Sequence, residues 1–282
     1  MKLGFAVLIS ICAAGAAGCF HDTATREREL TRSFKVAAGS VVVVDVSGGD
    51  VTVNRGAQGV VNLALRQHVR ARSDRAADSA IGRYDVAMEQ KGDTVTLRAR
   101  GREGRDWGWD GVDFSASIDV PPDVRLDIKT SGGKVRVGGE RTAAVKLRTS
   151  GGSVRVDGGS GDTDISTAGG EIVVRRALGG LRARTSGGNV DVRYLNMTRD
   201  VDLTSSGGSI DVRVARNAAF TFDARSNGGN IDINDLTTEN AVKDAGHEDQ
   251  QLNVAVNGGG TRRLTARSTG GNIRVQGTED ED

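Results

Sequence analysis

The chain has 282 residues, of which 40 are glycine, two are proline and only 4% are aromatic, which argues against an ordinary globular core of that size. Lys and Arg number 38 against 37 Asp and Glu, and the formal net charge of +1 rules out nucleic-acid binding through net charge alone. Charged residues make up 27% of the chain without long blocks of one sign, which argues against wholesale disorder.

The first 18 residues predict an export signal. Lys2 is followed by an apolar segment that is too short for a comfortable membrane span. The segment ends in Ala-Ala-Gly directly before Cys19, which resembles the signal of bacterial lipoproteins, although those prefer Leu where Ala16 stands. The resemblance implies that residues 1–18 are removed as a signal peptide and that Cys19 is acylated. The alternative is ordinary signal cleavage near residues 14–16.

Acylation of Cys19 would anchor an exported protein to a membrane of the cell envelope. Phe20 stands where Asp would retain a lipoprotein in the inner membrane, so the outer membrane is favoured if the host follows the usual sorting rule. Because Cys12 leaves with the signal, Cys19 remains as the sole cysteine and no intrachain disulfide is expected.

Residues 19–39 hold the attachment cysteine and a polar, charged stretch, which predicts a flexible tether. Residues 40–122 predict a β-rich N-terminal start or cap, because β-branched and apolar residues alternate in several segments. Ser73 predicts the N-cap of one short helix that ends near Gly82. We expect strands at 42–46, 51–53, 61–65, 84–88, 95–99 and 112–120, with a hairpin turn at 91–93.

A Gly-Gly doublet with constant neighbours organises residues 123–276. The first glycines of the seven doublets are Gly132, Gly151, Gly169, Gly187, Gly207, Gly228 and Gly270. Successive spacings are 19, 18, 18, 20, 21 and 42, and the last spacing is two periods, with Gly258–Gly260 in a degenerate extra unit. A period near 20 indicates a solenoid with about 18–21 residues per rung.

Apolar residues alternate with polar ones on both sides of each doublet, which predicts strand, Gly-Gly corner, strand and return loop. The doublet is expected to supply positive φ angles for the corner. Asn189, Asn230 and Asn272 are expected to stack at the corners, and the hydroxyl residues before the doublets are expected to form a ladder. These hydroxyl residues are Thr130, Thr149, Thr167, Thr185, Ser205, Ser226 and Ser268. The predicted fold is all-β, a single elongated β-solenoid similar to a parallel β-helix, with a β-rich cap that contains one short helix.

The segment IDVPPDVRLDIKTSGGKVRVGG at 118–139 and the TSGG-x-V-x-V units after it resemble the putative adhesin family of bacterial envelope proteins, a domain family of unknown function. The resemblance covers about residues 40–276. It implies a β-solenoid with this Gly-Gly rhythm. It implies no established biochemical activity, and it brings no catalytic residues to this chain.

Outward positions on the predicted strands are charged. One row predicts a basic stripe for anionic glycans or lipid headgroups. The alternative, which the pattern favours, is a solvated face that resists aggregation. The basic members of this row are Lys129, Arg148, Arg184, Arg225 and Arg267, with Ser166 and Thr204 between some of them. A parallel row of mostly alternating sign comprises Asp127, Lys146, Asp164, Arg182, Asp202 and Asp223.

Two acidic patterns carry oxygen ligands of the kind that Ca²⁺ prefers. Asp191, Asp211 and Asp232 fall in one predicted row, although one carboxylate per rung makes a poor cage. The run DGGSGD at 157–162 is similar to calcium-binding nonapeptide repeats, but it occurs once and has Thr163 where those repeats need Asp. A solvated row and a return loop explain these patterns better, so we expect no metal site and no cofactor.

Both tryptophans of the chain, Trp107 and Trp109, lie in one loop between Asp106 and Asp110. Aromatic faces beside carboxylates hold sugar rings by stacking and hydrogen bonding, so this loop is a candidate glycan-binding site. The alternative is a tryptophan plug over an edge of the solenoid.

The sequence carries little sign of catalysis, because its three histidines lack metal-ligand spacing and no nucleophile elbow or phosphate-binding loop is present. We therefore predict a non-catalytic interaction module that binds a partner protein or a glycan through its sheet faces. One alternative is a structural or sensory envelope component that faces the periplasm, and a minor one is a β-helix enzyme that acts on polysaccharide. Residues 277–282 are interpreted as an acidic tail that discourages end-to-end stacking.

Overall fold

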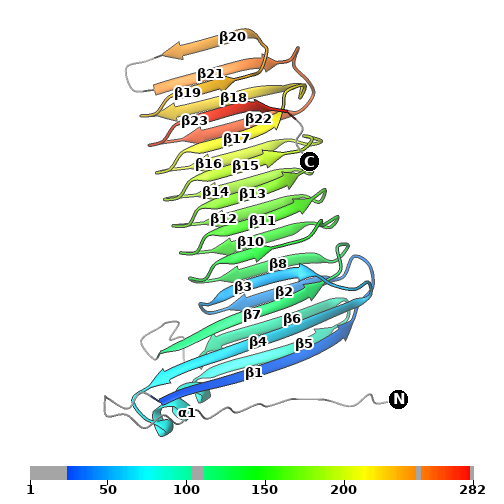
Figure 1. Cartoon of the computed structure of the whole chain (residues 1–282), viewed down its shortest axis with the longest axis vertical. Helices are drawn as coiled ribbons and strands as arrows, with labels where there is room; N and C mark the ends of the chain where they lie inside the picture. Colours follow the sequence, from blue (N-terminus) through cyan, green and yellow to red (C-terminus); the bar gives the residue numbers. More distant parts are fainter. Residues whose placement is uncertain (1–23, 103–110, 246–248, 280–282) are drawn as a thin grey trace. The chain divides into compact units, whose positions relative to one another are not determined.

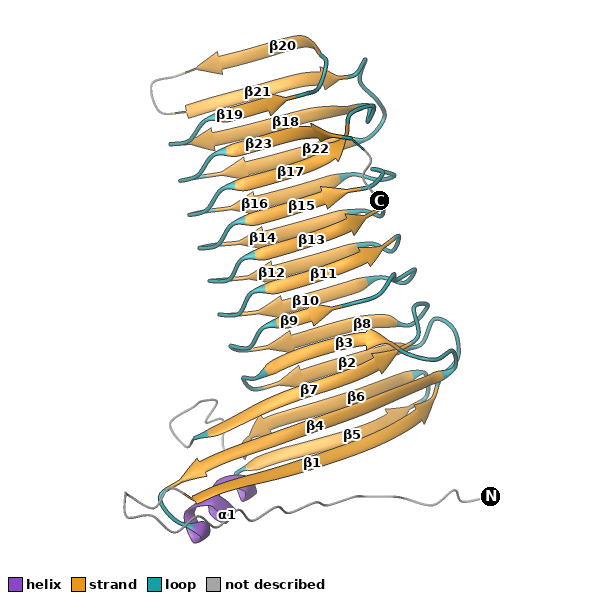
Figure 2. Ribbon diagram, in the orientation of Figure 1, coloured by secondary structure: helices purple, strands orange, loops and turns teal. Residues whose placement is uncertain are grey.

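Residues 24–102, 111–245 and 249–279 are described in the computed structural model of the chain (Figure 1). The chain divides into two compact units between Lys134 and Val135, somewhat later than the boundary at 122/123 that the sequence predicts. Strands dominate both units, and one short helix lies in the first (Figure 2). The predicted all-β fold with one helix is thus confirmed for the described residues.

The first unit holds two sheets, with the orders β1-β4-β7-β3 and β8-β2-β6-β5. The β1–β4, β4–β7 and β5–β6 pairs are antiparallel, whereas β2 pairs with β6 and β8 in parallel. The elements are β1 (Ala24–Lys35), β2 (Val41–Val46), β3 (Asp50–Arg55), β4 (Val60–Ala71), α1 (Asp74–Gly82), β5 (Tyr84–Lys91), β6 (Thr94–Gly101), β7 (Val112–Val120) and β8 (Arg125–Thr130).

The tether expected at 19–39 is wrong for residues 24–35, which form β1 and pair with β4 along their whole length. Arginines take half-buried positions on this strand where apolar residues are usual. Arg26 forms an ion pair with Asp74 at 2.9 Å, and Arg32 donates to the carbonyl oxygen of Met88 at 2.6 Å. Arginine can bury its aliphatic stem while its guanidinium group reaches polar partners. With arginine at these positions, the strand lacks the apolar alternation that identifies a strand in the sequence.

The predicted helix and hairpin of this unit are confirmed. The Ser73 hydroxyl accepts a hydrogen bond from the backbone N–H of Ala76 at 3.3 Å, and α1 ends at Gly82. β5 and β6 are antiparallel from Tyr84↔Gly101 to Lys91↔Thr94, which leaves the expected turn at residues 92–93.

The second unit also holds two sheets, with the orders β9-β11-β13-β15-β17-β23-β19 and β20-β21-β18-β22-β16-β14-β12-β10. Its strands are β9 (Val135–Val137), β10 (Val145–Thr149), β11 (Val154–Gly159), β12 (Thr163–Thr167), β13 (Ile172–Ala177), β14 (Leu181–Thr185), β15 (Val190–Tyr194), β16 (Val201–Ser205), β17 (Ile210–Ala215), β18 (Phe220–Asn227), β19 (Ile231–Asn234), β20 (Thr238–Ala245), β21 (Asp249–Val256), β22 (Arg263–Ser268) and β23 (Ile273–Thr278).

A Gly-Gly doublet joins a strand of one sheet to a strand of the other, and such a pair of strands is called a rung below. The rungs β10–β11, β12–β13, β14–β15 and β16–β17 stack in parallel in their chain order. Their inward side chains fill the space between the sheets, and Leu147, Ile165 and Leu203 are fully buried. The predicted β-solenoid is therefore confirmed.

The order of the last rungs in space differs from their order in the chain. β22 pairs with both β16 and β18, and β23 pairs with both β17 and β19. The rung at residues 263–278 is thus inserted between the rung at 201–215 and the rung at 220–234. All these pairs are parallel and have equivalent registers, so the repeat pattern alone does not distinguish the two orders.

The segment expected as a degenerate extra unit is an antiparallel hairpin instead. β20 pairs with β21, and β21 pairs with β18 along its length. The acidic tail is also shorter than expected, because Gly277 and Thr278 belong to β23. β23 lies between β17 and β19 and is not a terminal strand of the sheet. Residues 280–282 lie outside the described residues, so the anti-stacking role stays a prediction.

The hydroxyl residues before the doublets form a ladder to backbone groups rather than to one another. The Thr185 hydroxyl accepts from the N–H of Gly188 at 3.1 Å and donates to the carbonyl of Gly170 in the neighbouring rung at 2.9 Å. The same pair of bonds is made by Thr167, Ser205, Ser226 and Ser268. Each corner is thereby closed and tied to the next one.

Side chains at the corners form a second ladder, as the sequence predicts for asparagines. Asn189 Oδ1 accepts from the N–H of Ser209, and the Ser209 hydroxyl accepts from the N–H of Asn272. Asn272 Oδ1 accepts from the N–H of Asn230 at 2.9 Å, and Gln250 then bonds to the Asn230 side chain at 3.2 Å. The ladder follows the spatial order of the rungs and not their chain order.

The expected positive φ angles are wrong for most of the doublets. Among the doublets of the described residues 135–279, only Gly228 has a positive φ, at 113°. The second glycine is required by close approach instead, because a Cβ on Gly188 would lie 2.2 Å from the carbonyl oxygen of Gly170. A Cβ on Gly271 would likewise lie 2.4 Å from that of Gly208. The glycines let neighbouring corners stack directly on each other.

Candidate functional site

A row of arginines lies on the outer face of the sheet that contains β13, β15 and β17. In three consecutive rungs, the residue after the V-x-V or I-x-V stretch is arginine, namely Arg175, Arg193 and Arg213. The preceding residues Val174, Val192 and Val212 are buried, so alternation directs the arginines outward. Arg193 and Arg213 are direct neighbours in the parallel register. These three residues are called the arginine row below.

A β-bulge adds a further arginine beside the row. Val174 pairs with Val192 and Ala177 pairs with Tyr194, so two residues of β13 face the single residue Arg193 of β15. The extra residue is Arg176, which has a φ of 55° and forms an ion pair with Glu140 at 3.1 Å. Bulges of this kind re-aim side chains, and here the bulge concentrates guanidinium groups at one end of the sheet.

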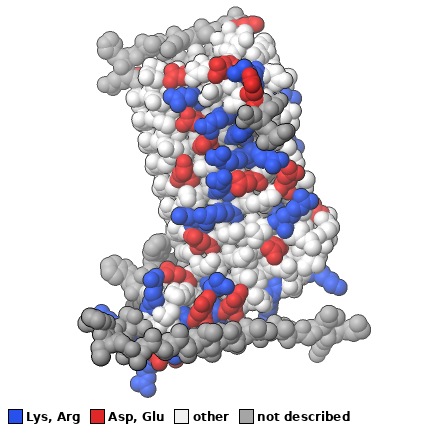
Figure 3. All heavy atoms as spheres, in the orientation of Figure 1, with Lys and Arg blue, Asp and Glu red and all other residues white. Residues whose placement is uncertain are grey.

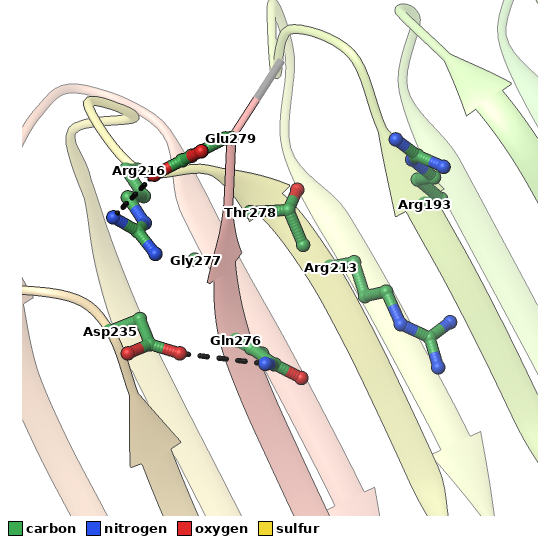
Figure 4. Close-up of a pocket in the computed structure, with 8 residues that line it drawn as sticks. All are labelled: Arg193, Arg213, Arg216, Asp235, Gln276, Gly277, Thr278 and Glu279. Atoms are coloured by element: carbon green, nitrogen blue, oxygen red, sulfur yellow. Dashed lines mark hydrogen bonds and ion pairs between the residues drawn. The ribbon is translucent and has the colours of Figure 1, made fainter. Parts of the chain in front are cut away.

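A shallow pocket of about 350 Å³ adjoins the row. In Figure 4, Arg193 and Arg213 lie on one side of the end of β23, and Arg216 and Asp235 lie on the other. The lining residues are Arg193, Arg213, Arg216, Asp235, Gln276, Gly277, Thr278 and Glu279. Basic, acidic and amide side chains therefore line one open depression, which is called the arginine pocket below.

Gly277 allows the chain to approach closely at this pocket. A Cβ at Gly277 would lie 2.3 Å from the carbonyl oxygen of Asp235 and 3.1 Å from Cγ of Arg216. Asp235 itself has a φ of 58°, and its carboxylate accepts a hydrogen bond from Gln276 at 3.4 Å. The end of β23 and the turn after β19 thus meet where a larger residue would hold them apart.

Two ion pairs lie at the pocket. Arg213 donates to Asp191 at 2.8 Å, and Arg216 forms an ion pair with Glu279 at 3.0 Å. The Arg216 and Glu279 side chains are 55% and 75% exposed. Exposed ion pairs are worth about 0–1 kcal/mol, so an incoming anion can replace the Glu279 carboxylate at little cost. The pocket is therefore chemically suited to carboxylate, sulfate or phosphate groups.

The face that carries the arginine row is basic over several strands. In Figure 3, Lys and Arg side chains gather along the middle of this face, over the odd-numbered strands from β11 to β17, with acidic side chains among them. Arg136 and Arg155 pair in register on β9 and β11, and Arg155 contacts Asp157 at 3.3 Å. An extended anion could follow this face from strand to strand, about 4.8 Å per step.

The basic stripe predicted from the sequence lies on the other sheet of this unit, except for Lys129, which belongs to the first unit. The register runs Arg148, Ser166, Arg184, Thr204, Arg267, Arg225, so the expected row exists with Arg267 before Arg225. Asp202 contacts Arg184 at 3.0 Å, Arg182 at 3.5 Å and Arg267 at 3.9 Å. Arg225 contacts Asp249 at 3.4 Å. Carboxylates therefore offset much of this stripe, and its binding role stays a prediction.

The aspartate row considered as a cation site is broken by an inserted arginine. Arg274 pairs in register with both Asp211 and Asp232, and it contacts the Asp211 carboxylate at 3.7 Å. Asp191 is held by Arg213. The insertion of the rung at 263–278 therefore replaces a run of three carboxylates with a mixed-charge row.

The run at 157–162 also has a structural explanation. Asp162 contacts Arg199 at 2.6 Å and accepts from the N–H of Gly180 at 3.1 Å, while Asp157 contacts Arg155. Across the described ranges, no group of three His, Cys, Asp or Glu side chains is placed to hold a metal ion.

Several predicted features fall outside the described residues. They are the signal peptide at 1–18, Cys19, and the loop with Asp106, Trp107, Trp109 and Asp110. The glycan role of that loop and the lipid anchor stay predictions. Within the part of the chain that the structure describes, no helix has the length and apolar character needed to cross a membrane.

Sequence reasoning missed the arginine pocket, although one signal was available. The triplet Asp-Val-Arg occurs at 191–193 and again at 211–213, which places the same charges at the same positions of consecutive rungs. Arg216, Asp235 and Glu279 carry no such signal, because the inserted rung brings them together.

The chain is similar to one described protein family and to several solved structures. The family model with the description Toastrack DUF4097 matches residues 34–276. A search of curated proteins finds no match. The structure of a putative adhesin from Bacteroides fragilis covers 88% of this chain and 97% of its own, at 15% identity and a TM-score of 0.43.

Two further structures are similar at lower identity. A putative cell adhesion protein from Clostridium sporogenes covers 89% of this chain and 100% of its own, at 9% identity and a TM-score of 0.40. A putative lipid binding protein from Parabacteroides distasonis covers 88% and 96%, at 9% identity and a TM-score of 0.36. At these values none of the three structures supports a statement about the ligand of this chain.

Proposed function

The chain belongs to the Toastrack DUF4097 family, and we propose that it is a non-catalytic binding module of the cell envelope. In this proposal, the sheet face that carries the arginine row holds anionic glycans. The observation that carries the proposal is that Arg193 and Arg213 of that row line one open pocket together with Arg216. The export signal and Cys19 support the envelope location, with a lipid as the membrane attachment.

Guanidinium groups on adjacent parallel strands suit a polymer with repeated negative charges. Each arginine offers a planar fork of donors that matches a carboxylate or sulfate group. Single exposed contacts are weak, but a chain that meets several of them in turn gains from each additional contact. The face is also open along the sheet, which suits an extended ligand better than a small molecule.

A binding assay with labelled polysaccharides tests the proposal. Polygalacturonate and a sulfated polysaccharide are titrated against the purified mature protein, with neutral dextran as the control ligand. We expect binding of the anionic polymers only, with an affinity that falls at least tenfold between about 50 and 300 mM salt. Binding that is unaffected by salt, or equal binding of dextran, would contradict the proposal.

Two matched double variants locate the binding face. Arg193→Gln with Arg213→Gln removes two members of the arginine row, and Arg148→Gln with Arg184→Gln removes two members of the stripe on the opposite sheet. We expect about a tenfold loss of affinity for the first variant, and less than about twofold for the second, because Arg148 and Arg184 lie on the other sheet and do not line the arginine pocket. The reverse result would move the site to the predicted stripe. If neither variant changes affinity, the sheet faces are not the binding surface.

A further inference from the structure

The rung at 263–278 does not lie where the order of the chain would place it. Its two neighbours are the rungs at 201–215 and 220–234, which are consecutive in sequence but separated in space by one rung. The chain therefore passes this position, builds the rung at 220–234 and the hairpin β20–β21, and returns to fill it. This position is called the rung slot below.

Both sides of the rung slot present contacts of the kind that other rungs make with their neighbours. On one side, Ser268 donates to the carbonyl of Gly208 at 3.0 Å, and the N–H of Asn272 bonds to Ser209 at 3.2 Å. On the other side, Ser226 donates to the carbonyl of Gly271 at 3.0 Å. The slot thus recognises one Ser/Thr-x-Gly-Gly unit by backbone bonds and by two ladders of side-chain bonds.

A glycine-rich turn connects the slot segment to the rest of the unit. Residues 257–262 have the sequence NGGGTR, and Asn257, Gly258 and Gly259 all have positive φ angles. The Asn257 side chain holds the start of this turn by donating to the carbonyls of Arg216 at 2.7 Å and Ala218 at 2.8 Å. This turn is called the hinge below, because its glycines permit other backbone paths that would leave the slot segment itself unchanged.

We propose that the rung slot is an interaction site for a second copy of this chain, whose residues 263–278 enter the slot by reciprocal exchange. An exchanged segment makes the same strand pairs and the same ladder bonds as the chain's own segment, because the sequence is identical. The balance between the closed monomer and the exchanged dimer then depends on hinge conformation and protein concentration. The inference goes beyond glycan binding and does not depend on it.

Shortening the hinge tests the proposal. Deletion of residues 258–262 leaves only Asn257 between Val256 and Arg263, and two Cα–Cα steps reach about 7 Å. The two ends lie on either side of β18, about 9.6 Å apart at two strand spacings, so the segment cannot return to its own slot. An insertion of three glycines at the same place serves as the matched control. By light scattering after size exclusion, we expect a dimer for the shortened hinge and a monomer for the lengthened one. A folded monomer with the shortened hinge would overturn the proposal.

A disulfide trap identifies the interface and also covers the case in which the shortened chain does not fold. Thr204 and Arg267 are direct neighbours across β16 and β22, with outward side chains. Thr204→Cys and Arg267→Cys are placed on separate chains in which Cys12 and Cys19 are replaced by Ser. The two chains are mixed in about 4 M urea, refolded together at high concentration and oxidised. We expect a covalent heterodimer, and its formation should fall when the mixture is refolded at a hundredfold dilution. Absence of the heterodimer at high concentration would overturn the proposal.

Discussion

The two glycines of a doublet have different structural roles. The second glycines Gly170, Gly188, Gly208, Gly229 and Gly271 lie against the corner of the neighbouring rung, where a Cβ would strike a carbonyl group. A Cβ on the first glycine has room, because at Gly187 it would lie 3.6–3.7 Å from its nearest neighbours, which is ordinary van der Waals distance. Sequence reasoning treats the doublet as one conformational device, whereas the structure assigns a steric requirement to its second member.

Paired alanine substitutions should separate these two roles. Gly188→Ala places a Cβ 2.2 Å from the Gly170 carbonyl oxygen and should lower the free energy of unfolding by about 2–4 kcal/mol. Gly187→Ala has room and a negative φ, so it should change that free energy by less than about 1 kcal/mol. Urea denaturation followed by circular dichroism measures both. Equal effects would show that close approach does not account for the second glycine.

Tyr194 is a second position where burial has a measurable consequence. Its side chain is 2% exposed, and its hydroxyl donates to the carbonyl of Gly179 at 3.2 Å. Burial raises the pKa of the Tyr194 phenol above its ordinary value of 10.0, and the charge of Asp162 raises it further. The folded state therefore keeps this proton at pH values where the unfolded state has released it.

The free energy of unfolding should consequently fall as the pH rises above about 10. Below that pH both states hold the proton and the group adds no pH dependence; above it, the contribution is at most about 1.4 kcal/mol per pH unit. Tyr194→Phe should remove this part of the alkaline slope, and Tyr84→Phe, the control at the other tyrosine, should leave it in place. Urea denaturation between pH 8 and 11.5 compares the three proteins. An unchanged slope in Tyr194→Phe would contradict the assignment.

At the element scale, the rung is an exchangeable module. The rungs β10–β11, β12–β13 and β14–β15 follow each other at steps of 18 residues, with Val145 opposite Thr163 and Thr163 opposite Leu181. Each rung brings its own hydroxyl, which bonds to the corner before it. Contacts of this kind are made with nearest neighbours only, so the interior rungs should add to stability in nearly equal steps.

Removal of one whole rung should therefore leave a folded protein. Deletion of residues 163–180 brings β10 next to β14 in the same register, with the Thr185 hydroxyl facing the Gly152 carbonyl in place of Thr167. We expect a cooperative unfolding transition with a lower midpoint and a smaller m-value. The matched control is deletion of residues 163–171, which removes half a rung and should abolish folding. Unfolding of the 18-residue deletion would contradict modular stacking.

At the scale of the whole molecule, the sequence predicts those features that are periodic. The doublets and the alternating valines predict the solenoid and the contents of its rungs, and Ser73 predicts the start of the helix. Each of these features depends on local spacing in the sequence. β1 was missed because arginines such as Arg26 and Arg32 hold its half-buried positions. The insertion of the rung at 263–278 was missed because equivalent registers make the neighbours interchangeable in sequence.

The candidate site was missed for the same reason as the rung order. Arg193 and Arg213 could be placed side by side from their spacing, but Arg216, Asp235 and Glu279 meet only because β23 lies between β17 and β19. The sequence predicts a continuous row of Asp191, Asp211 and Asp232. In the structure, Arg274 lies between Asp211 and Asp232. Surface chemistry in a repeat protein thus depends on which rungs are neighbours, and that information is not contained in the repeat itself.

The insertion of one rung also bears on the time at which the fold is finished. During synthesis, residues 220–256 emerge before residues 263–278. Until the later segment has emerged, β17 and β19 lack β23, the strand that pairs with both of them. A solenoid that stacks in chain order has one open edge as it grows, whereas this protein has a second one inside its future ladder. Open strand edges are templates for aggregation. A nascent chain is therefore most exposed to aggregation in the interval between these two segments.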